Sequence, residues 1–414
     1  MKTRPTIDLI TIGDELLLGL TRNGHLTYLG EQFAFRGAAP NRNIVCRDEA
    51  GEIRRNFELC WEEADIVITT GGLGPTSDDR TRDIIAEALG LELLYSDEVE
   101  EDIRQKFRSF HRKMGPNNKK QAYYPDGAEI IMNAQGTAPG LWLEKDGKLL
   151  IMLPGPPREL NPMFEDQILP RLSREGRLAD ADTIVGFQTS GIGESALEIQ
   201  LDPLLIPHAD INVAFCAHYG TVDVRLSSIS GETDIQLIRE LAESCVQDLG
   251  RYFLTYGKRG ITPVVIDQLR EAQQSVAVAE SCTGGLLGAA FTAVAGSSDV
   301  FQGGVISYTN EAKHELLGVP QDLLDQFGAV SEQVVIAMAE GAMKKLHSPW
   351  ALSTSGIAGP GGGTPEKPVG TVFVGLAGPD GSTARKLDLR GNRGIVRERT
   401  VHVALDILRR ALLK

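Results

Sequence analysis

The chain has 414 residues, of which 42% are hydrophobic and 24% charged, and its formal net charge is −14. A chain of this length is expected to form two to four domains rather than one core. The acidic balance argues against a general binder of nucleic acid or of acidic membranes, because phosphate backbones require clustered cations. It does not exclude a small anionic ligand held by local groups.

The cysteines are odd in number and include no CxxC pair; they are Cys46, Cys60, Cys216, Cys245 and Cys282. Neither a disulfide framework nor a structural zinc site is therefore expected. The N-terminal segment lacks the long apolar stretch of a signal peptide, and no run of about 18 apolar residues could span a bilayer. We therefore expect a cytoplasmic protein.

Three regions follow one another along the chain. Residues 1–170 alternate short apolar runs such as "IDLITIG" and "ADIVITTGG" with helical segments, which predicts a mostly parallel sheet with helices on both faces. Residues 171–252 contain two strand-like segments and the helical "TDIQLIRELAESCVQDLG", the pattern of a small α+β domain. Residues 261–414 return to an α/β pattern, and "LTYGKRGITP" is the expected junction between the second and third regions.

Several glycine-rich loops end predicted strands of the first region. In "TTGGLGPTSDDRTRD" the glycines allow a ligand to approach the backbone, and Thr76 and Ser77 can cap the next helix. Backbone amides at such a turn favour an anion such as phosphate. The adjacent carboxylates of Asp78 and Asp79 fit that arrangement if a divalent cation lies between them and the phosphate.

Each of these loops alone can equally be a tight turn or a helix cap. Four of them in one domain favour a binding site, since ligands of open α/β sheets collect at the carboxyl ends of strands. The other three are "TIGDELLLG", "NAQGTAPG" and "LPGPPRE". None of the strings is a P-loop or a simple dinucleotide-binding fingerprint.

Taken together, these four strings resemble the CinA family (competence/damage-inducible protein A). The resemblance runs over the whole chain and implies an N-terminal MoaB/MogA-like, molybdopterin-binding α/β/α domain, a KH-like connecting domain, and an α/β amidase domain at the C-terminus. The expected bounds are 1–170, 171–252 and 253–414. In relatives the first domain is associated with ADP-ribose pyrophosphatase activity that depends on a divalent metal ion (Mg, Mn or Co).

The resemblance also implies site residues in the first domain. Asp79 matches the acidic residue of the glycine loop, and Asp48 in "VCRDEAGEI" matches a second acidic residue facing it, although Asp48 can equally cap a helix. Relatives usually have a Thr-Asn pair where this chain has Gly24 and His25, a departure that can alter the site. The expected metal ligands are Glu15, Asp48, Asp78 and Asp79, and the expected substrate-binding residues are Gly71, Gly72, Gly74, Thr76, Gly136 and Thr137.

The third region carries further strings that resemble the CinA C-terminal domain, also found as the stand-alone protein PncC. They are "AESCTGG", "AGSSDVFQGGVISYTNEAK", "GAVSE", "SGIAGPGGGTPEKPVGTV" and "GNRGIVRERT". Members of that family hydrolyse the amide of nicotinamide mononucleotide (NMN) to nicotinic acid mononucleotide and ammonia.

Amide hydrolysis needs a nucleophile, a base and an oxyanion site. A thiol nucleophile at Cys282 lacks an evident base, since the nearby His314 stands alone. The resemblance instead implies Ser298 as nucleophile, Lys313 as base and Tyr308 as its partner, because burial can lower the pKa of a lysine. The alternative is that Ser298 caps a helical turn and that Lys313 is solvated.

The remaining expectations concern substrate binding by the third region. Ser281 and Thr283 end a strand to line the pocket, with Ser281 counted among the catalytic residues, and Gly284 and Gly285 open a helix whose N-terminus suits a phosphate. Arg393 or Arg397 can bind phosphate bidentately. The loop with Gly359 and Gly361 can supply amides or be merely flexible, and Asn310 completes the set.

Other classes of function stay open at this point. One is a non-catalytic nucleotide or pterin binder that acts through partners in DNA uptake or recombination, and another is a molybdopterin ligand in the first domain. The expected assembly is a symmetric homodimer. The expected ligands are small nucleotides (NMN and ADP-ribose), with no nucleic acid and no membrane.

Overall fold

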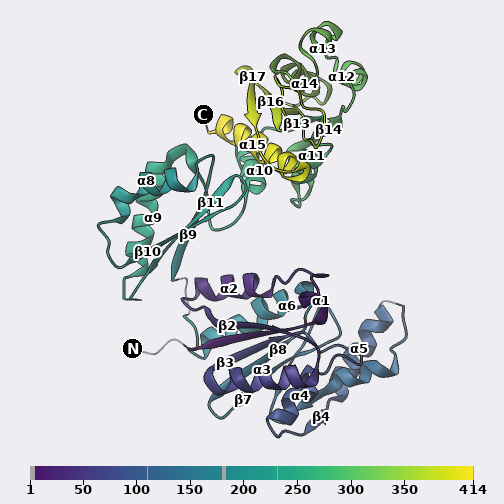
Figure 1. Ribbon diagram of the computed structural model, residues 1–414, viewed down its shortest axis with the longest axis vertical. Coiled ribbons are helices and arrows are strands. Elements are labelled where there is room, and N and C mark those ends of the chain that lie inside the picture. The colour runs from purple at the N-terminus through teal and green to yellow at the C-terminus, as the bar shows by residue number, and fades with distance from the viewer. Residues whose placement is uncertain (1–4, 110, 180–182, 231, 414) are drawn as a thin grey trace. The chain divides into compact units, whose positions relative to one another are not determined.

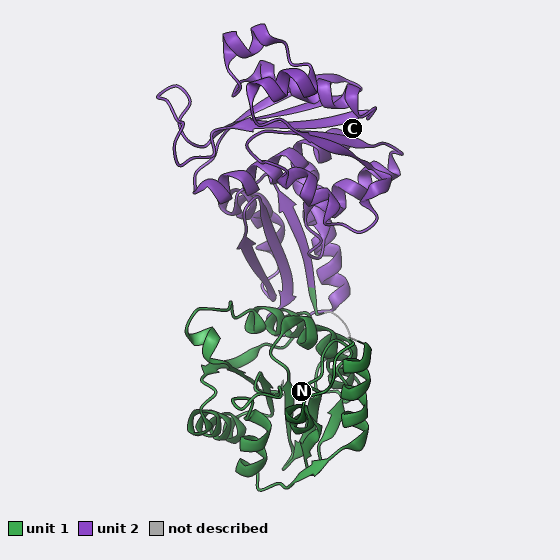
Figure 2. Cartoon of the chain, turned by 90° about the vertical axis from the view of Figure 1, so that its right-hand side faces the viewer, with its two compact units in different colours: residues 1–184 green, residues 185–414 purple. Residues whose placement is uncertain are grey.

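The computed structural model describes residues 5–109, 111–179, 183–230 and 232–413. The chain divides into two compact units, residues 1–184 and residues 185–414 (Figure 2). None of the helices in these ranges is long and apolar enough to cross a membrane.

The first unit is built on a six-stranded sheet in the order β2-β1-β3-β8-β7-β6 (Figure 1). Strands β2, β1, β3 and β8 run parallel to one another, whereas β7 and β6 are antiparallel additions at one edge. The strands are β1 (Ile7–Ile12), β2 (Pro40–Cys46), β3 (Ile66–Thr70), β6 (Glu129–Ile131), β7 (Gly140–Lys145) and β8 (Lys148–Leu153).

Helices cover both faces of this sheet, as the alternation of apolar runs predicts. One face packs against α2 (His25–Phe35), α6 (Pro157–Met163), the π-helical segment η2 (Phe164–Ile168) and α7 (Leu169–Arg174). The other face packs against α3 (Ala50–Glu63) and α4 (Thr81–Ala88). The α/β/α expectation is therefore confirmed for this unit.

Two further segments of the first unit surround the site described below. The short helix α1 (Asp14–Leu17) follows β1 directly. Residues 93–125 leave the main sheet to form β4 (Leu93–Tyr95), α5 (Asp97–Ser109), the turn η1 (Pro116–Ala122) and β5 (Tyr123–Pro125). Strands β4 and β5 pair with each other in a separate antiparallel ribbon.

The second unit begins with a four-stranded sheet in the order β10-β11-β9-β12. The strands are β9 (Ile184–Ser190), β10 (Ile211–Ala217), β11 (Thr221–Ser228) and β12 (Phe253–Tyr256). Helices α8 (Glu194–Leu205) and α9 (Ile235–Leu249) share its apolar core, and the turn η3 (Gly250–Tyr252) leads into β12. This is the small α+β region that the sequence predicted, and its likeness to a KH domain stays a prediction.

The rest of the second unit is a five-stranded sheet in the order β14-β13-β15-β16-β17. Strands β14, β13 and β15 are parallel, and β16 and β17 continue antiparallel. The strands are β13 (Val276–Glu280), β14 (Phe301–Ile306), β15 (Trp350–Gly356), β16 (Thr371–Gly378) and β17 (Gly381–Asp388).

Helices again cover both faces of this sheet. On one face lie α10 (Ile261–Glu271), α11 (Leu286–Thr292) and α15 (Arg393–Leu412). On the other lie α12 (Asn310–Leu317), α13 (Gln321–Phe327) and α14 (Glu332–Lys345). The turn η4 (Ser297–Asp299) lies between α11 and β14.

The structure moves both predicted domain boundaries toward the C-terminus. Position 170 falls inside α7, whose Leu169 and Leu172 are buried in the core of the first unit. Position 252 precedes β12, and β12 pairs with β9 of the four-stranded sheet. The sequence placed these boundaries too early because tertiary packing, rather than composition, decides to which core a terminal helix or strand belongs.

Candidate functional site

A cavity of ≈ 600 Å³ lies where β1, β3 and β8 of the first unit end. Its position follows from the parallel strands, because their carboxyl ends share one edge of the sheet. Eight of the ten residues expected at this site line it, namely Glu15, Asp48, Gly71, Gly72, Gly74, Asp78, Asp79 and Thr137. Of the expected set, Thr76 and Gly136 do not line it.

Carboxylates crowd the mouth of this cavity. Asp48 Oδ2 accepts a hydrogen bond of 3.0 Å from the Asp14 amide. Burial raises the pKa of Asp48, and the negative charges of Asp14, Glu15 and Asp78 raise it further. Like charges held together in this way favour a bound cation, because the cation removes their mutual repulsion.

The oxygen donors fit a hard divalent cation such as Mg²⁺. Within the described ranges, however, no three acidic, His or Cys side chains are placed to hold a metal by themselves. Mg²⁺ usually binds through one or two carboxylates and completes its shell with water and substrate phosphates. The residues therefore fit a cation that Asp48 and a neighbouring carboxylate share with a phosphate ligand.

Asp79 makes a local contact that limits this role. Its Oδ2 accepts a 2.9 Å bond from the Thr76 amide and a short hydrogen bond from the Thr76 hydroxyl. A Cβ atom at Gly74 would lie 2.4 Å from the same oxygen, so a glycine is needed there. Asp79 thus holds the glycine loop in shape, and Asp48, Glu15 and Asp78 are the better candidates for the cation.

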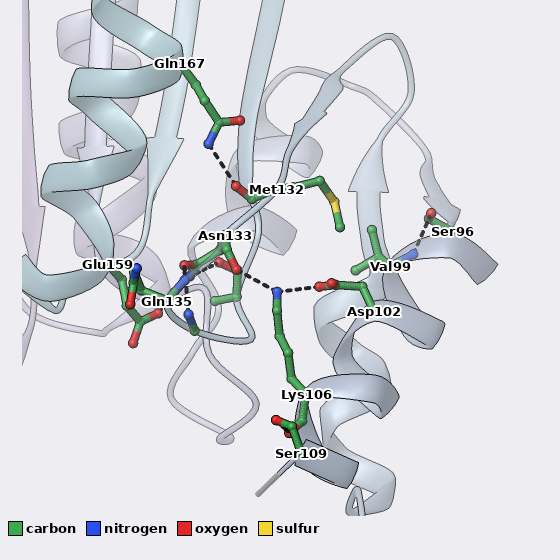
Figure 3. A network of polar contacts seen from close by, with 12 residues as sticks. Ser96, Val99, Asp102, Lys106, Ser109, Met132, Asn133, Gln135, Glu159 and Gln167 are labelled. Carbon is green, nitrogen blue, oxygen red and sulfur yellow. Dashed lines mark hydrogen bonds and ion pairs between the residues drawn. The ribbon is translucent and has the colours of Figure 1, made fainter.

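A network of polar contacts includes Asn133 and Glu159 (Figure 3), and Glu159 lines the cavity. Asn133 donates to Glu159 Oε2 at 2.8 Å, and its own side-chain oxygen accepts from the Gly136 amide at 2.9 Å. A Cβ at Gly136 would lie 2.0 Å from Glu159 Oε2, which explains the glycine. Gly136 therefore shapes the loop rather than contacting ligand. Glu159 lines the cavity and had not been expected there.

His25 also lines the cavity. It is 6% exposed, and its Nδ1 lies 2.8 Å from the Thr70 hydroxyl. Burial lowers the pKa of His25, although the Gly155 carbonyl and the charge of Glu15 oppose this. The ring is therefore a neutral, buried wall of the cavity that fastens α2 to the end of β3.

The second candidate site lies where β13 and β14 of the five-stranded sheet end. The Lys313 ammonium is buried, with the residue 1% exposed, and it lies 3.1 Å from Ser281 Oγ. It also donates to the carbonyls of Ser307 and Tyr308, at 2.9 and 3.4 Å. Among the described residues no carboxylate lies within ion-pairing distance of Lys313. Burial therefore lowers its pKa, as a lysine base requires.

The expected pairing of Ser298 with Lys313 is wrong. Ser298 lies in the exposed turn η4 that precedes β14, whereas Lys313 follows β14 in α12. The six residues of β14 separate the two positions by on the order of 20 Å. Because β13 and β14 run parallel and in register, it is Ser281, at the end of β13, that meets Lys313. Ser298 instead lies beside the Arg270–Asp299 ion pair at the opposite edge.

Cys282 follows Ser281 but is not suited to nucleophilic attack. Burial raises the pKa of its thiol to about 11, so the thiol stays protonated at neutral pH. Its side chain joins the apolar core of the sheet. The preference for a serine nucleophile over this thiol agrees with both observations.

The expectation of a phosphate at the Gly284–Gly285 turn is also wrong. The buried carboxylate of Glu280 accepts hydrogen bonds from the amides of Gly285, Leu287 and Gly288, at 2.9, 3.0 and 2.7 Å. The Gly284 amide is bound to the Ser281 carbonyl. The amides of this turn are therefore already occupied, and a protein carboxylate takes the place of the expected anion.

Arg393 and Arg397, in the first turns of α15, contact the loops near Ser281. Arg397 donates to the Thr283 carbonyl at 2.6 Å, and Arg393 donates to the Gly359 carbonyl at 3.0 Å and the Tyr308 hydroxyl at 3.4 Å. Thr283 itself is buried, with its hydroxyl 2.7 Å from that of Thr354. Gly361 and Asn310 are exposed. The arginines thus link the loops around Ser281.

Comparison with known proteins gives a consistent assignment. The family model of the CinA C-terminal domain matches residues 259–412. The family model of the probable molybdopterin binding domain matches residues 8–174. A relative from Thermoanaerobacter pseudethanolicus, provisionally named a competence-damage inducible protein, is 40% identical over 98% of both chains. The chain belongs to the CinA family.

A further relative and a solved structure are similar to this chain. The CinA-like protein of Kosmotoga olearia is 37% identical, and 98% of each chain is covered. The crystal structure of the competence/damage inducible protein CihA from Agrobacterium tumefaciens is 40% identical and matches 37% of this chain and 94% of its own, with a TM-score of 0.36. The MoaB/MogA-like N-terminal domain and the CinA C-terminal domain thus share one chain.

Proposed function

We propose that the C-terminal domain is an amidohydrolase that converts NMN and water to nicotinic acid mononucleotide and ammonia. The observation that carries this proposal is the contact between Ser281 Oγ and the buried Lys313 amine. No carboxylate of the described residues lies within ion-pairing distance of that amine. A serine hydroxyl beside a lysine of lowered pKa is a nucleophile with its base.

The reaction on this proposal has two halves. Ser281 Oγ attacks the carboxamide carbon while Lys313 takes the hydroxyl proton, and the same proton passes to the leaving ammonia. The product is an ester on Ser281. Water then attacks the ester, again losing its proton to Lys313, and Ser281 recovers its hydrogen as the nicotinate leaves.

The remaining groups of the site assist binding on this proposal. Because Glu280 occupies the amides at the start of α11, the substrate phosphate is assigned to Arg393 and Arg397 at the start of α15. Tyr308 is 62% exposed and touches Arg393, so it is assigned to the substrate-facing rim and not to proton transfer.

The experiment is ammonia release from NMN by the purified full chain, followed by chromatography of the nucleotide product. Equal amounts of ammonia and nicotinic acid mononucleotide are expected, with no effect of a chelator. Nicotinamide and ribose phosphate as products would contradict the proposal, because they require cleavage of the glycosidic bond instead.

We also propose that the N-terminal domain hydrolyses the pyrophosphate of ADP-ribose with a divalent cation (Mg, Mn or Co). The support is the cavity in which Glu15, Asp48 and Asp78 face a loop of glycines. A cation bound there would polarise the phosphoryl oxygens. The carboxylates hold and orient it, and His25 and Glu159 close the walls. Release of AMP and ribose phosphate from ADP-ribose is the corresponding assay.

A pterin ligand is the second candidate for the N-terminal domain, because residues 8–174 match the probable molybdopterin binding domain. Thermal-shift measurements with ADP-ribose and with molybdopterin, added separately, distinguish the two. The ligand that raises the melting temperature of the first unit is the one that its folded state binds.

A further inference from the structure

A second cavity, of ≈ 610 Å³, lies on the other side of the glycine loop from the acidic cavity. Neighbouring residues face different cavities: Thr76 and Ser77 line this one, whereas Asp78 and Asp79 line the acidic one. Pro75 lines both. One loop is therefore the common wall of two cavities, each large enough for a small molecule.

The charge of this second cavity is opposite to that of the first. Arg82 is 4% exposed and donates to Asp83 Oδ1 through Nε and one terminal nitrogen, at 3.2 and 3.1 Å. Lys120 lies 4.0 Å from Asp83 and donates to the Thr76 carbonyl at 3.2 Å. Among the residues that line this cavity, two cations therefore face one carboxylate, and the carboxylates of Asp78 and Asp79, which line the acidic cavity, also act on Lys120 and Arg82.

The remaining wall is apolar and aromatic. Leu93, Pro116 and Tyr123 line it, and they all come from residues 93–125 outside the main sheet. Tyr123 is 41% exposed, and its ring is held by an edge contact with Tyr95 at a centroid distance of 4.9 Å. A ring fixed from one side in this way offers a planar surface on which an aromatic ligand can stack.

We propose that this second cavity binds a nucleoside 5′-phosphate moiety, with its base against Tyr123 and Leu93 and its phosphate toward Arg82 and Lys120. A flat apolar wall and a positively charged wall in one cavity match that ligand, which is aromatic at one end and anionic at the other. This inference rests on the proposed pyrophosphatase function. On that function, the second cavity holds the adenosine half of ADP-ribose, and the pyrophosphate extends past Pro75 into the acidic cavity.

The test is calorimetric titration of the full chain with AMP, without metal, for the wild type and three variants. Tyr123→Ala removes the stacking surface, and Leu93→Trp fills the cavity. Leu94→Ala changes the neighbouring residue of β4, which does not line the cavity, and serves as the matched control. We expect wild type and Leu94→Ala to bind AMP alike, and the other two variants to bind at least about 10-fold more weakly.

Three results would overturn the inference. AMP affinity unchanged by both Tyr123→Ala and Leu93→Trp places the nucleoside elsewhere. Equal affinity for inorganic phosphate and AMP shows that no base is recognised. If the wild type does not bind AMP, the cavity does not bind a nucleoside phosphate. Circular dichroism of each variant must match the wild type, and the conservative Tyr123→Phe, which keeps the ring, should retain AMP affinity.

The same variants separate this inference from the pyrophosphatase proposal. If AMP binds as expected but ADP-ribose is not cleaved, the cavity assignment stands and the proposed reaction fails. If ADP-ribose is cleaved with an unchanged KM in Tyr123→Ala and Leu93→Trp, the reaction stands and the cavity assignment fails. If both the cavity assignment and the proposed reaction are right, the KM for ADP-ribose increases in these two variants.

Discussion

The two candidate sites differ in how complete they are before a ligand arrives. In the second unit, Ser281 and Lys313 are already in contact, and no ion is needed to join them. In the first unit, Glu15, Asp48 and Asp78 surround a wide cavity but do not converge on one point. Burial lowers the pKa of Lys313, whereas burial and the neighbouring carboxylates raise the pKa of Asp48. On our proposal, a cation and a phosphate complete the acidic site.

This difference has a physical origin in the elements that carry the groups. Ser281 and Lys313 follow adjacent, in-register parallel strands, so the sheet itself fixes their distance. Asp78 lies in a glycine loop and Asp48 in the segment after β2, where the backbone is set by local hydrogen bonds such as that from Asp14 to Asp48. A rigid sheet edge gives a preformed pair, and loops give a site that its ligand completes.

The largest effect is expected from the serine that touches the lysine. Ser281→Ala should lower the rate of ammonia release from NMN on the order of 10³-fold or more, because the nucleophile is lost. Ser298→Ala is the control, and it should keep the wild-type rate because η4 lies at the opposite edge of the sheet. The reverse result, with Ser298→Ala inactive, would reinstate the pairing that the structure contradicts.

The second-largest effect is expected from metal removal, which should affect the two proposed reactions differently. A chelator should abolish ADP-ribose cleavage, and Asp48→Asn should lower it about 10²-fold, because a carboxylate that holds the cation is lost. Ammonia release from NMN should be unaffected by either treatment. Rates of both reactions are measured on the same preparation. Loss of the amidase activity on chelation would show that the second site also uses a metal.

The pH dependence of the amidase should then report on Lys313. Its pKa is lowered by burial from the ordinary 10.5, and the neutral amine is the active form. The kcat/KM for NMN should therefore rise with pH and reach its plateau at a lower pH than an exposed lysine would give. Lys313→Arg, which stays protonated, should remain inactive across the range. A profile that falls as pH rises would contradict a lysine base.

The smallest effect is expected from the histidine of the first unit. Burial lowers the pKa of His25 below 6.5, so the folded unit resists its protonation, and stability present above about pH 6.5 is lost as the pH falls. His25→Asn removes the hydrogen bond to Thr70 and should lower the melting temperature at pH 7.5 by about 2–4 °C. The variant should also lose less stability than the wild type between pH 7 and pH 5.5. A parallel pH dependence in both proteins would contradict the buried neutral ring.

Much of the fold could be predicted from the sequence because apolar periodicity reports burial directly. The alternation in residues 1–170 and 261–414 correctly predicted two largely parallel sheets with helices on both faces. The glycine-rich loop at the end of a predicted strand placed Asp78 at the site, and the family resemblance added Glu15 and Asp48; all three line the cavity. Packing decided the domain boundaries, which the sequence therefore placed too early.

Two site predictions failed for different reasons. The direction of β14 was readable in the sequence: Ser298 precedes the strand and Lys313 follows it, so they could not meet at one edge. The role of Glu280 was not readable in this way. Its side chain turns back onto the amides of Gly285, Leu287 and Gly288, and no sequence spacing distinguishes that contact from a free anion site.

No pattern in the sequence indicated that Glu159 belongs to the first site. Asn133, 26 residues earlier in the chain, holds the Glu159 side chain at the cavity.

A homodimer remains a proposal, and it is independent of both reactions. Light scattering of the purified chain at micromolar concentration should give a mass near twice 44.8 kDa. A monomer under those conditions would contradict the proposal without bearing on the contact between Ser281 and Lys313.

On the proposed mechanism, Ser281 forms the covalent intermediate of amide hydrolysis. Its most direct test is an acid quench of the full chain early in a single turnover of NMN, followed by peptide mass mapping. A nicotinoyl ester of the substrate ribotide is expected on Ser281. The adduct should be absent from the Ser281→Ala protein. In the wild type, fragment-ion sequencing should place it on Ser281 rather than on Ser298, because no Lys or Arg separates the two serines. An adduct on Ser298 or on Cys282 would contradict the proposed mechanism.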